Sequence, residues 1–166
     1  MPKRIKIIAA IAFVMSSYYA APVAAQQETQ DKYWQTWCSG PSRSEAMLSC
    51  VTTQSLRIKE TGQLLFKVDI AYPAKATDPE FRLQAPLGFF LPGKIKLTVD
   101  GAHPWDLDIG MCDKRGCFLQ TKLPADMLGA MKSGTQLEID FAPSADKRQK
   151  TGVPLTGFSK AIAAIQ

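Results

Sequence analysis

The chain is poor in histidine, with His103 as the single histidine among 166 residues. Metal sites built on two or three imidazoles are therefore excluded, and a Ser-His-Asp or Cys-His centre has only one possible base. His103 lies between Gly101-Ala102 and Pro104, a composition typical of a surface turn. Glycine loops for phosphate, helical H-E-x-x-H motifs and calcium loops are also absent. The sequence predicts neither a cofactor nor a metal.

The chain also has little net charge beyond its amino terminus. The full sequence carries +5, but its first 25 residues hold three basic and no acidic residues. The remainder has 17 Lys and Arg against 15 Asp and Glu, a net charge of +2. Nucleic-acid binding normally requires a concentrated basic face, so we expect no nucleic-acid partner. The one basic cluster, Lys147, Arg148 and Lys150, lies in a polar stretch from Pro143 to Gly152 that is interpreted as a solvated loop.

No apolar run reaches the ~18 residues of a membrane-spanning helix. The apolar stretch from Ile7 to Val14 follows basic residues and precedes the small residues Val23-Ala24-Ala25, the order of a secretory signal peptide. We predict a signal peptide over residues 1–25, a flexible leader over 26–32 and one domain over 33–166. After cleavage near Ala25, the protein is expected in the periplasm or outside the cell, without a transmembrane anchor.

Four cysteines in an exported chain indicate disulfide bonds. Cys112 and Cys117 enclose four residues that favour a turn, including Gly116, so they suit a bridge across a tight hairpin. That pairing leaves Cys38 with Cys50. The other two pairings stay open, because a β-sandwich can bring distant strands within bonding distance. A zinc or thiol-redox site would favour the closer spacing C-x-x-C.

Most of the chain alternates apolar and polar residues with a period of two, the pattern of half-buried strands. The alternation is clearest over Ile95 to Val99, Trp105 to Ile109 and Leu137 to Phe141. Further candidate strands lie at residues 33–39, 48–58, 63–72, 80–84, 117–122 and 153–155. Strands at this density predict a mainly β fold, an antiparallel β-sandwich or a barrel-like domain.

Two stretches depart from this alternation and predict short helices at about 124–132 and 157–165. The first has Pro124 at a first helical position and Gly134 just beyond its end. In the second, Phe158, Ala161, Ile162 and Ile165 recur at helical spacing after Thr156, a candidate N-cap. Both apolar stripes are interpreted as core rather than as binding surface.

Asp106 and Asp108 are the best pair of carboxylates for acid–base chemistry, because residues two apart on a strand share a face. They carry the alternative hypothesis of a periplasmic hydrolase. If residues 100–104 form a five-residue hairpin loop, Val99 faces Trp105 on the core side and Lys96 faces Asp108 on the other. The acids then belong to an exposed charge pattern.

From that register we predict that the hairpin of residues 94–109 is the central pair of the sandwich, with Trp105 buried and both aspartates facing solvent.

The segment Phe89-Phe90-Leu91 is the candidate partner-binding surface. Prolines at 86 and 92 hold it out of regular strand pairing, which favours exposure of its apolar side chains. The alternative is that these side chains close one rim of the core.

Several segments follow one another along the chain: the proline-glycine segment 86–93, the strand 94–101, the Cys112 to Cys117 hairpin, the helix end Met131 to Gly134 and the closing Leu155 to Ala161. Together with Trp37-Cys38 and Cys50, they resemble the invasion-associated locus B family over about residues 33–165.

The resemblance implies an exported, disulfide-bonded β protein of Gram-negative bacteria, mainly alphaproteobacteria. In pathogenic members, the family is associated with invasion of host cells. It is not known as a family of enzymes, so only the four cysteines carry over to this chain and no catalytic residue does. We therefore expect a non-enzymatic envelope or periplasmic protein that binds an unknown protein or envelope partner.

Overall fold

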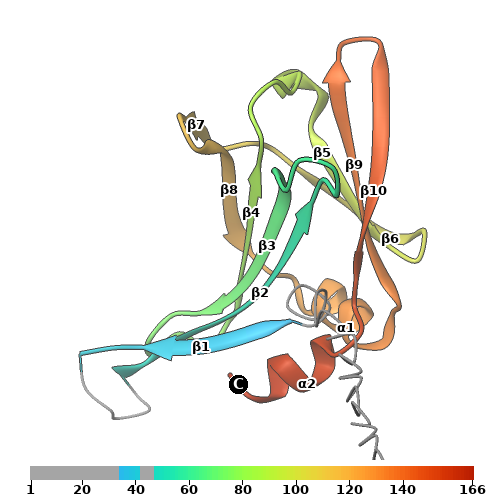
Figure 1. Ribbon diagram of the computed structural model, residues 1–166. Helices are drawn as coiled ribbons and strands as arrows, with labels where there is room; N and C mark the ends of the chain where they lie inside the picture. Colours follow the sequence, from blue (N-terminus) through green and yellow to red (C-terminus); the bar gives the residue numbers. More distant parts are fainter. Residues whose placement is uncertain (1–33, 42–46) are drawn as a thin grey trace, which may run out of the picture.

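Two antiparallel β-sheets make up most of the protein (Figure 1). The computed structural model describes residues 34–41 and 47–166, so the predicted signal peptide and leader lie outside the described residues. One sheet has six strands in the order β1-β2-β3-β4-β8-β7. Its strands are β1 (Gln35–Ser39), β2 (Ser49–Arg57), β3 (Leu64–Tyr72), β4 (Glu80–Ala85), β7 (Met111–Asp113) and β8 (Gly116–Lys122).

The second sheet has four strands in the order β10-β9-β5-β6. Its strands are β5 (Ile95–Val99), β6 (Ala102–Leu107), β9 (Gln136–Ser144) and β10 (Lys147–Pro154). Each sheet has two free margins, so the described strands form no closed barrel, and the sandwich is the correct one of the two predicted architectures.

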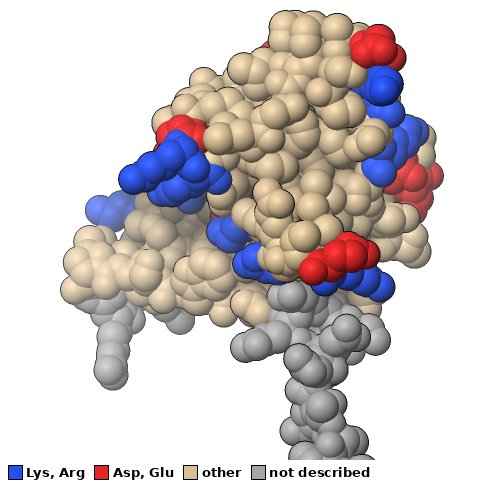
Figure 2. All heavy atoms as spheres, turned by 45° about the horizontal axis from the view of Figure 1, so that its top comes forward, with Lys and Arg blue, Asp and Glu red and all other residues tan. Residues whose placement is uncertain are grey.

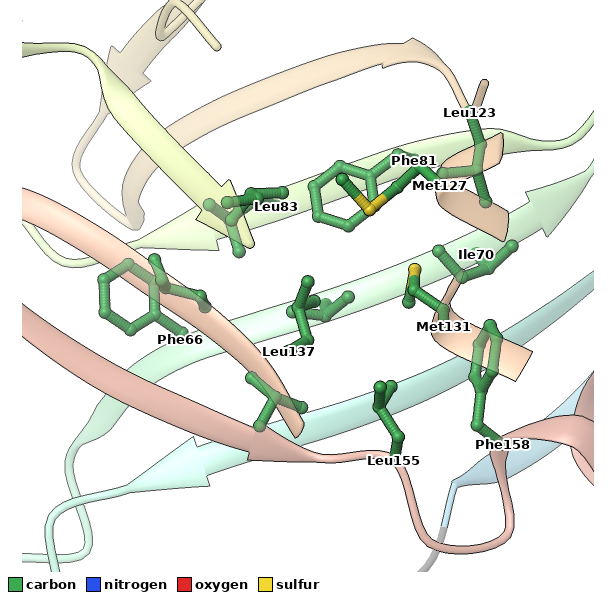
Figure 3. Close-up of a cluster of buried hydrophobic side chains, with 14 of the residues drawn as sticks. Phe66, Ile70, Phe81, Leu83, Leu123, Met127, Met131, Leu137, Leu155 and Phe158 are labelled. Carbon is green, nitrogen blue, oxygen red and sulfur yellow. The ribbon is translucent and has the colours of Figure 1, made fainter. Parts of the chain in front are cut away.

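The core lies between the two sheets and is built by the alternation in the sequence. Val68, Leu83 and Leu119 lie in register across three strands of the larger sheet, and all three are buried. In the smaller sheet, Leu97 is paired with Ile139, and both are fully enclosed. Figure 3 shows how side chains from both sheets and from a helix gather in this cluster.

Two short helices follow the predicted positions. Helix α1 (Ala125–Ser133) begins after Pro124 and buries Met127 and Met131. Helix α2 (Phe158–Ala163) begins after Gly157, whose φ of 82° suits glycine, rather than after the expected cap Thr156. Phe158 lies against Trp34 with 4.7 Å between ring centroids. The helices lie side by side at the lower end of the molecule in Figure 1.

The predicted register of the 94–109 hairpin is wrong by two residues. The structure pairs Lys96 with Asp106 and Leu97 with Trp105. The turn contains only Asp100 and Gly101, with φ angles of 49° and 77°, as a two-residue hairpin turn of the Asp-Gly type requires. A shift of two residues keeps every side chain on its predicted face, so both aspartates still point away from the core.

The hairpin is also not the central pair. Strand β5 lies inside the four-stranded sheet, but β6 lies at its margin. Trp105 is consequently half-buried rather than buried, with its ring 5.2 Å from that of Phe81.

The stretch from Pro143 to Gly152, predicted as a loop, is strand on both sides of a two-residue turn at Ala145 and Asp146. Residues Lys147 to Pro154 form β10, which pairs with β9 along most of its length. The register shifts between Lys147 and Gln149, which interrupts the two-residue alternation. Because β10 is a margin strand with most side chains exposed, its composition is that of a loop.

Each edge strand of the six-stranded sheet is joined to its neighbouring strand by a disulfide bond. Cys38 on β1 is bonded to Cys50 on β2, and Cys112 on β7 is bonded to Cys117 on β8. In both cases the bonded residues are directly opposite each other in the strand register. Gly116 completes the second hairpin with a φ of 135°. A Cβ atom at that position would lie 2.3 Å from the carbonyl oxygen of Ala85.

Candidate functional site

The segment between β4 and β5 is held by its central aromatic residue. Phe89 is half-buried and stacks on Phe66 with 5.8 Å between ring centroids. It also meets the ring of Phe141 edge-on at 5.0 Å. Aromatic pairs of this kind add ~0.5–1.5 kcal/mol beyond the burial of their area. Phe89 therefore belongs to the rim of the core.

Three further contacts fix the segment against β9 and β10. The backbone N–H of Phe90 donates to the carbonyl oxygen of Ala142 at 2.9 Å. Gly93 approaches the same residue so closely that a Cβ atom there would lie 2.5 Å from the Cβ of Ala142. The Nη1 of Arg148 donates to the carbonyl oxygen of Gly93 at 2.7 Å, while its Nε donates to Asp140 Oδ1, also at 2.7 Å. The segment from Phe89 to Gly93 is thus held against the smaller sheet.

On this anchored backbone, three large apolar side chains face solvent. Leu87 is 58% exposed, Leu91 49% and Phe90 39%. We call Leu87, Phe90 and Leu91 the apolar loop. The structure places two of the three sequence candidates, Phe90 and Leu91, on the surface and the third, Phe89, against the core.

Sequence reasoning missed Leu87. Its neighbours Pro86 and Gly88 contained the signal, because both residue types interrupt strands and Gly88 has a φ of 100°, which is outside strand geometry.

Two hollows lie on either side of the apolar loop. The first has a volume of about 270 Å³ and is lined by Leu87 together with Lys114 and Arg115 of the β7–β8 turn. The second, of about 310 Å³, begins at Pro92 and is lined by Lys94, Lys96, Asp106 and Arg148. Figure 2 turns this end of the molecule forward and shows a broad surface free of charged side chains, with Lys and Arg at its left and right margins and Asp or Glu beside them.

The turn beside the first hollow carries an ion pair. Arg115 Nη2 lies 2.7 Å from Asp113 Oδ2, and the guanidinium carbon is 5.3 Å from the centre of the Phe118 ring. Hydrogen bonds from the side chain and then from the backbone N–H of Arg115 lower the pKa of Asp113. The hydrogen bond with Asp113 also raises the pKa of Arg115, so both groups are charged at neutral pH.

Asp106 and Asp108 are both exposed and each lies beside a lysine. Asp106 Oδ1 is 3.9 Å from Lys96 Nζ, and Asp108 Oδ2 is 3.3 Å from Lys94 Nζ. Exposed pairs of this kind contribute ~0–1 kcal/mol each. Both carboxylates face solvent, and neither lies in a buried pocket beside another carboxylate.

Within residues 34–41 and 47–166, no cluster of three or more His, Cys, Asp or Glu side chains could hold a metal ion. His103 lies on β6, exposed and with a φ of 54°, instead of in a turn. The same described ranges contain no helix with the length and apolar character needed to cross a bilayer.

Comparison with known proteins gives consistent results at three levels. A family model described as "Invasion associated locus B (IalB) protein" matches residues 34–166. The invasion protein B homologs of Brucella abortus strain 2308 and of Brucella abortus biovar 1 strain 9-941 are each 25% identical to the chain over 153 residues. Each alignment covers 90% of this chain and 87% of the relative.

The crystal structure of invasion associated protein B from Bartonella henselae superposes with a TM-score of 0.68. The match covers 80% of this chain and 89% of the other, at 18% sequence identity, so it concerns the fold.

Proposed function

Because the chain belongs to the invasion associated locus B family, we propose that it is an exported, non-enzymatic binding protein of the cell envelope or periplasm. On this proposal it serves host-cell invasion or another envelope function. The names of the Brucella abortus relatives support the first role. The basic, apolar and small residues that follow one another over positions 1–25 support export, with a mature chain that begins near Gln26.

The observation that carries a binding role is the anchored apolar loop. A group of large apolar side chains close together on a protein surface is typical of an interaction site. Here Leu87, Phe90 and Leu91 are exposed although the aromatic ring between them, Phe89, is held in the core. Because the segment from Phe89 to Gly93 is already held, little conformational entropy is lost there when a partner binds. The apolar loop is the binding surface of the proposal.

A complementation experiment tests this assignment. A strain without its own copy receives the wild-type gene, the double variant Leu87→Ser/Leu91→Ser, or the control Trp37→Ser, which alters another exposed apolar side chain on β1. We expect both variants to accumulate in the envelope extract like the wild type. We expect only the double variant to lose invasion of host cells or the envelope function that deletion abolishes.

Two results would refute the assignment: full activity of the double variant, or an equal loss in the Trp37→Ser control. The variant Asp106→Asn/Asp108→Asn separates the binding role from the hydrolase hypothesis. We expect it to keep full activity, because these side chains form only exposed pairs with Lys96 and Lys94.

A further inference from the structure

Basic side chains border the apolar loop on both sides. Lys114 and Arg115 line the hollow next to Leu87, and Lys94 and Lys96 line the hollow that begins directly after Leu91. The apolar loop therefore has Lys and Arg side chains on both of its sides. In Figure 2 the uncharged surface has Lys and Arg at its margins, with Asp and Glu beside them. The surface of an anionic bilayer has the complementary arrangement, because its apolar chains lie directly beneath a layer of phosphates.

The apolar content of the loop also favours a lipid surface over a protein partner. Stable protein interfaces bury at least ~1,000 Å², with a continuous apolar centre. The loop offers three large exposed apolar side chains. Binding to a bilayer surface requires less area, because the insertion of a few side chains and the attraction of each nearby cation add together.

Acidic side chains lie near the same cations and must be included. Asp108 and Asp106 pair with Lys94 and Lys96 at 3.3 and 3.9 Å, and all four side chains are well exposed. Such pairs are weak, so both lysines can leave them for a phosphate at little cost, while the two aspartates stay nearby and offset part of the attraction to an anionic surface.

Unlike the lysines, the two arginines near the apolar loop are held by short hydrogen bonds within the protein. Arg148 is bound to Asp140 and to the Gly93 carbonyl, and Arg115 is bound to Asp113. These bonds leave Lys94, Lys96 and Lys114 as the cations for lipid phosphates, with Arg148 as a positioning residue.

We propose that this end of the protein docks onto a bilayer that contains anionic phospholipid. Leu87, Phe90 and Leu91 insert into the interface, while Lys94, Lys96 and Lys114 contact lipid phosphates. The inference rests on the proposed function, because it names the partner of the same apolar loop. Arg148 and Phe89 hold the loop in the orientation needed for insertion.

Flotation with vesicles tests the proposal. The protein is expressed as the full chain and purified from the envelope extract, so all variants share one amino terminus. It is mixed with vesicles of phosphatidylcholine alone or of phosphatidylcholine with phosphatidylglycerol. We expect binding to the mixed vesicles, weak binding to phosphatidylcholine alone, and a decrease as salt screens the charges.

Two matched pairs of variants assign the binding to this end. Leu91→Ser should weaken binding about tenfold, whereas Trp37→Ser on β1 should not. Lys94→Gln/Lys114→Gln should weaken binding to mixed vesicles about tenfold. The control Lys132→Gln/Lys160→Gln removes two charges from the helical end and should leave binding unchanged. Circular dichroism spectra verify that each variant is folded.

The proposal is overturned if the protein floats with neither kind of vesicle, or equally with both. It is also overturned if the two variants of either matched pair lose binding equally. Failure here is distinct from failure of the proposed function. Absent vesicle binding, with invasion still dependent on Leu87 and Leu91, would reject the lipid and retain the binding surface. Vesicle binding without any effect of those residues on invasion or envelope function would reject the proposed function.

Discussion

The edge strands of the two sheets are stabilised by different interactions. In the six-stranded sheet, β1 has five exposed residues and β7 has only three residues in all, so hydrophobic burial contributes little at either margin. Each of these strands is joined to its neighbour by a disulfide. In the four-stranded sheet, β6 buries Leu107 and β10 buries Val153. The disulfides thus join the edge strands that bury few apolar side chains. The edge strands of the other sheet are stabilised by hydrophobic burial and ion pairs.

The largest effect should follow removal of the Cys38–Cys50 bond. The loop-entropy relation gives about 3 kcal/mol for a bond between cysteines 12 residues apart. We therefore expect Cys38→Ala/Cys50→Ala to lower the free energy of unfolding by that amount in urea denaturation followed by circular dichroism. The wild type measured with a reductant, which breaks both disulfides, gives the combined loss for comparison. A loss smaller than that of the other disulfide would show that loop length does not set the stabilisation.

Removal of the Cys112–Cys117 bond should cost less, about 2 kcal/mol, because the cysteines are only five residues apart. The same denaturation experiment on Cys112→Ala/Cys117→Ala measures it. Hydrogen exchange should show faster exchange at β7 amides, with β9 amides as the internal reference. Uniformly faster exchange across both sheets would contradict a local role for this bond.

In the four-stranded sheet, Asp100 ties the β5–β6 turn to the start of β9, and this tie should depend on pH. Its carboxylate accepts hydrogen bonds from the side chain and backbone N–H of Thr135 and from the backbone N–H of Gln136. These bonds lower the pKa of Asp100 below its ordinary value of 3.8. The stabilisation is therefore present above that value and is lost as the pH falls through the lowered pKa.

We expect Asp100→Asn to be less stable than the wild type at neutral pH, with the difference shrinking in acid. Thermal unfolding of both proteins over a series of acidic pH values measures it. The partner variant Thr135→Ala serves as the control: it removes one donor but keeps the titrating group and its two backbone donors, so it should retain a weaker pH dependence. A difference that stays constant down to strong acid would contradict the assignment.

The smallest effect should come from the exposed ion pairs of the four-stranded sheet. Replacement of Lys96 by Ala breaks its pair with Asp106, and we expect a loss of only about 0.5 kcal/mol that disappears in high salt. Urea denaturation at low and high salt measures it. Lys122→Ala, which breaks an exposed pair with Asp78 in the larger sheet, provides the matched comparison. A loss that survives high salt would show that the lysine stabilises by packing.

The elements that depend on local sequence could be predicted, and the features that depend on distant contacts could not. Alternation around Ile95 to Val99 and the Pro124 signal gave a strand and a helix close to their observed bounds. The Asp100-Gly101 pair was a local signal for a two-residue turn, and the prediction of a five-residue loop did not use it. Strand β6 is an edge strand, which leaves Trp105 half-buried. This position depends on the pairing of β5 with β9 and cannot be predicted from the sequence of the hairpin alone.

The candidate site shows the same division. Prolines 86 and 92 correctly marked an irregular apolar segment, and two of its members, Phe90 and Leu91, are exposed. The position of Phe89 against the core depends on the rings of Phe66 and Phe141, which come from strands far away in the sequence. No local pattern distinguishes adjacent phenylalanines in a loop, so their opposite orientations required the structure.

The sulfur connectivity has a consequence for how the chain matures. Each cysteine is bonded to the next one along the sequence, so the two covalent rings neither overlap nor enclose one another. When a chain is oxidised in the order in which it leaves a translocation channel, the first two thiols to appear are already native partners, and so are the next two. If the chain is exported as proposed, we expect an oxidant acting in this order to form the native bonds without an enzyme that reshuffles mispaired cysteines.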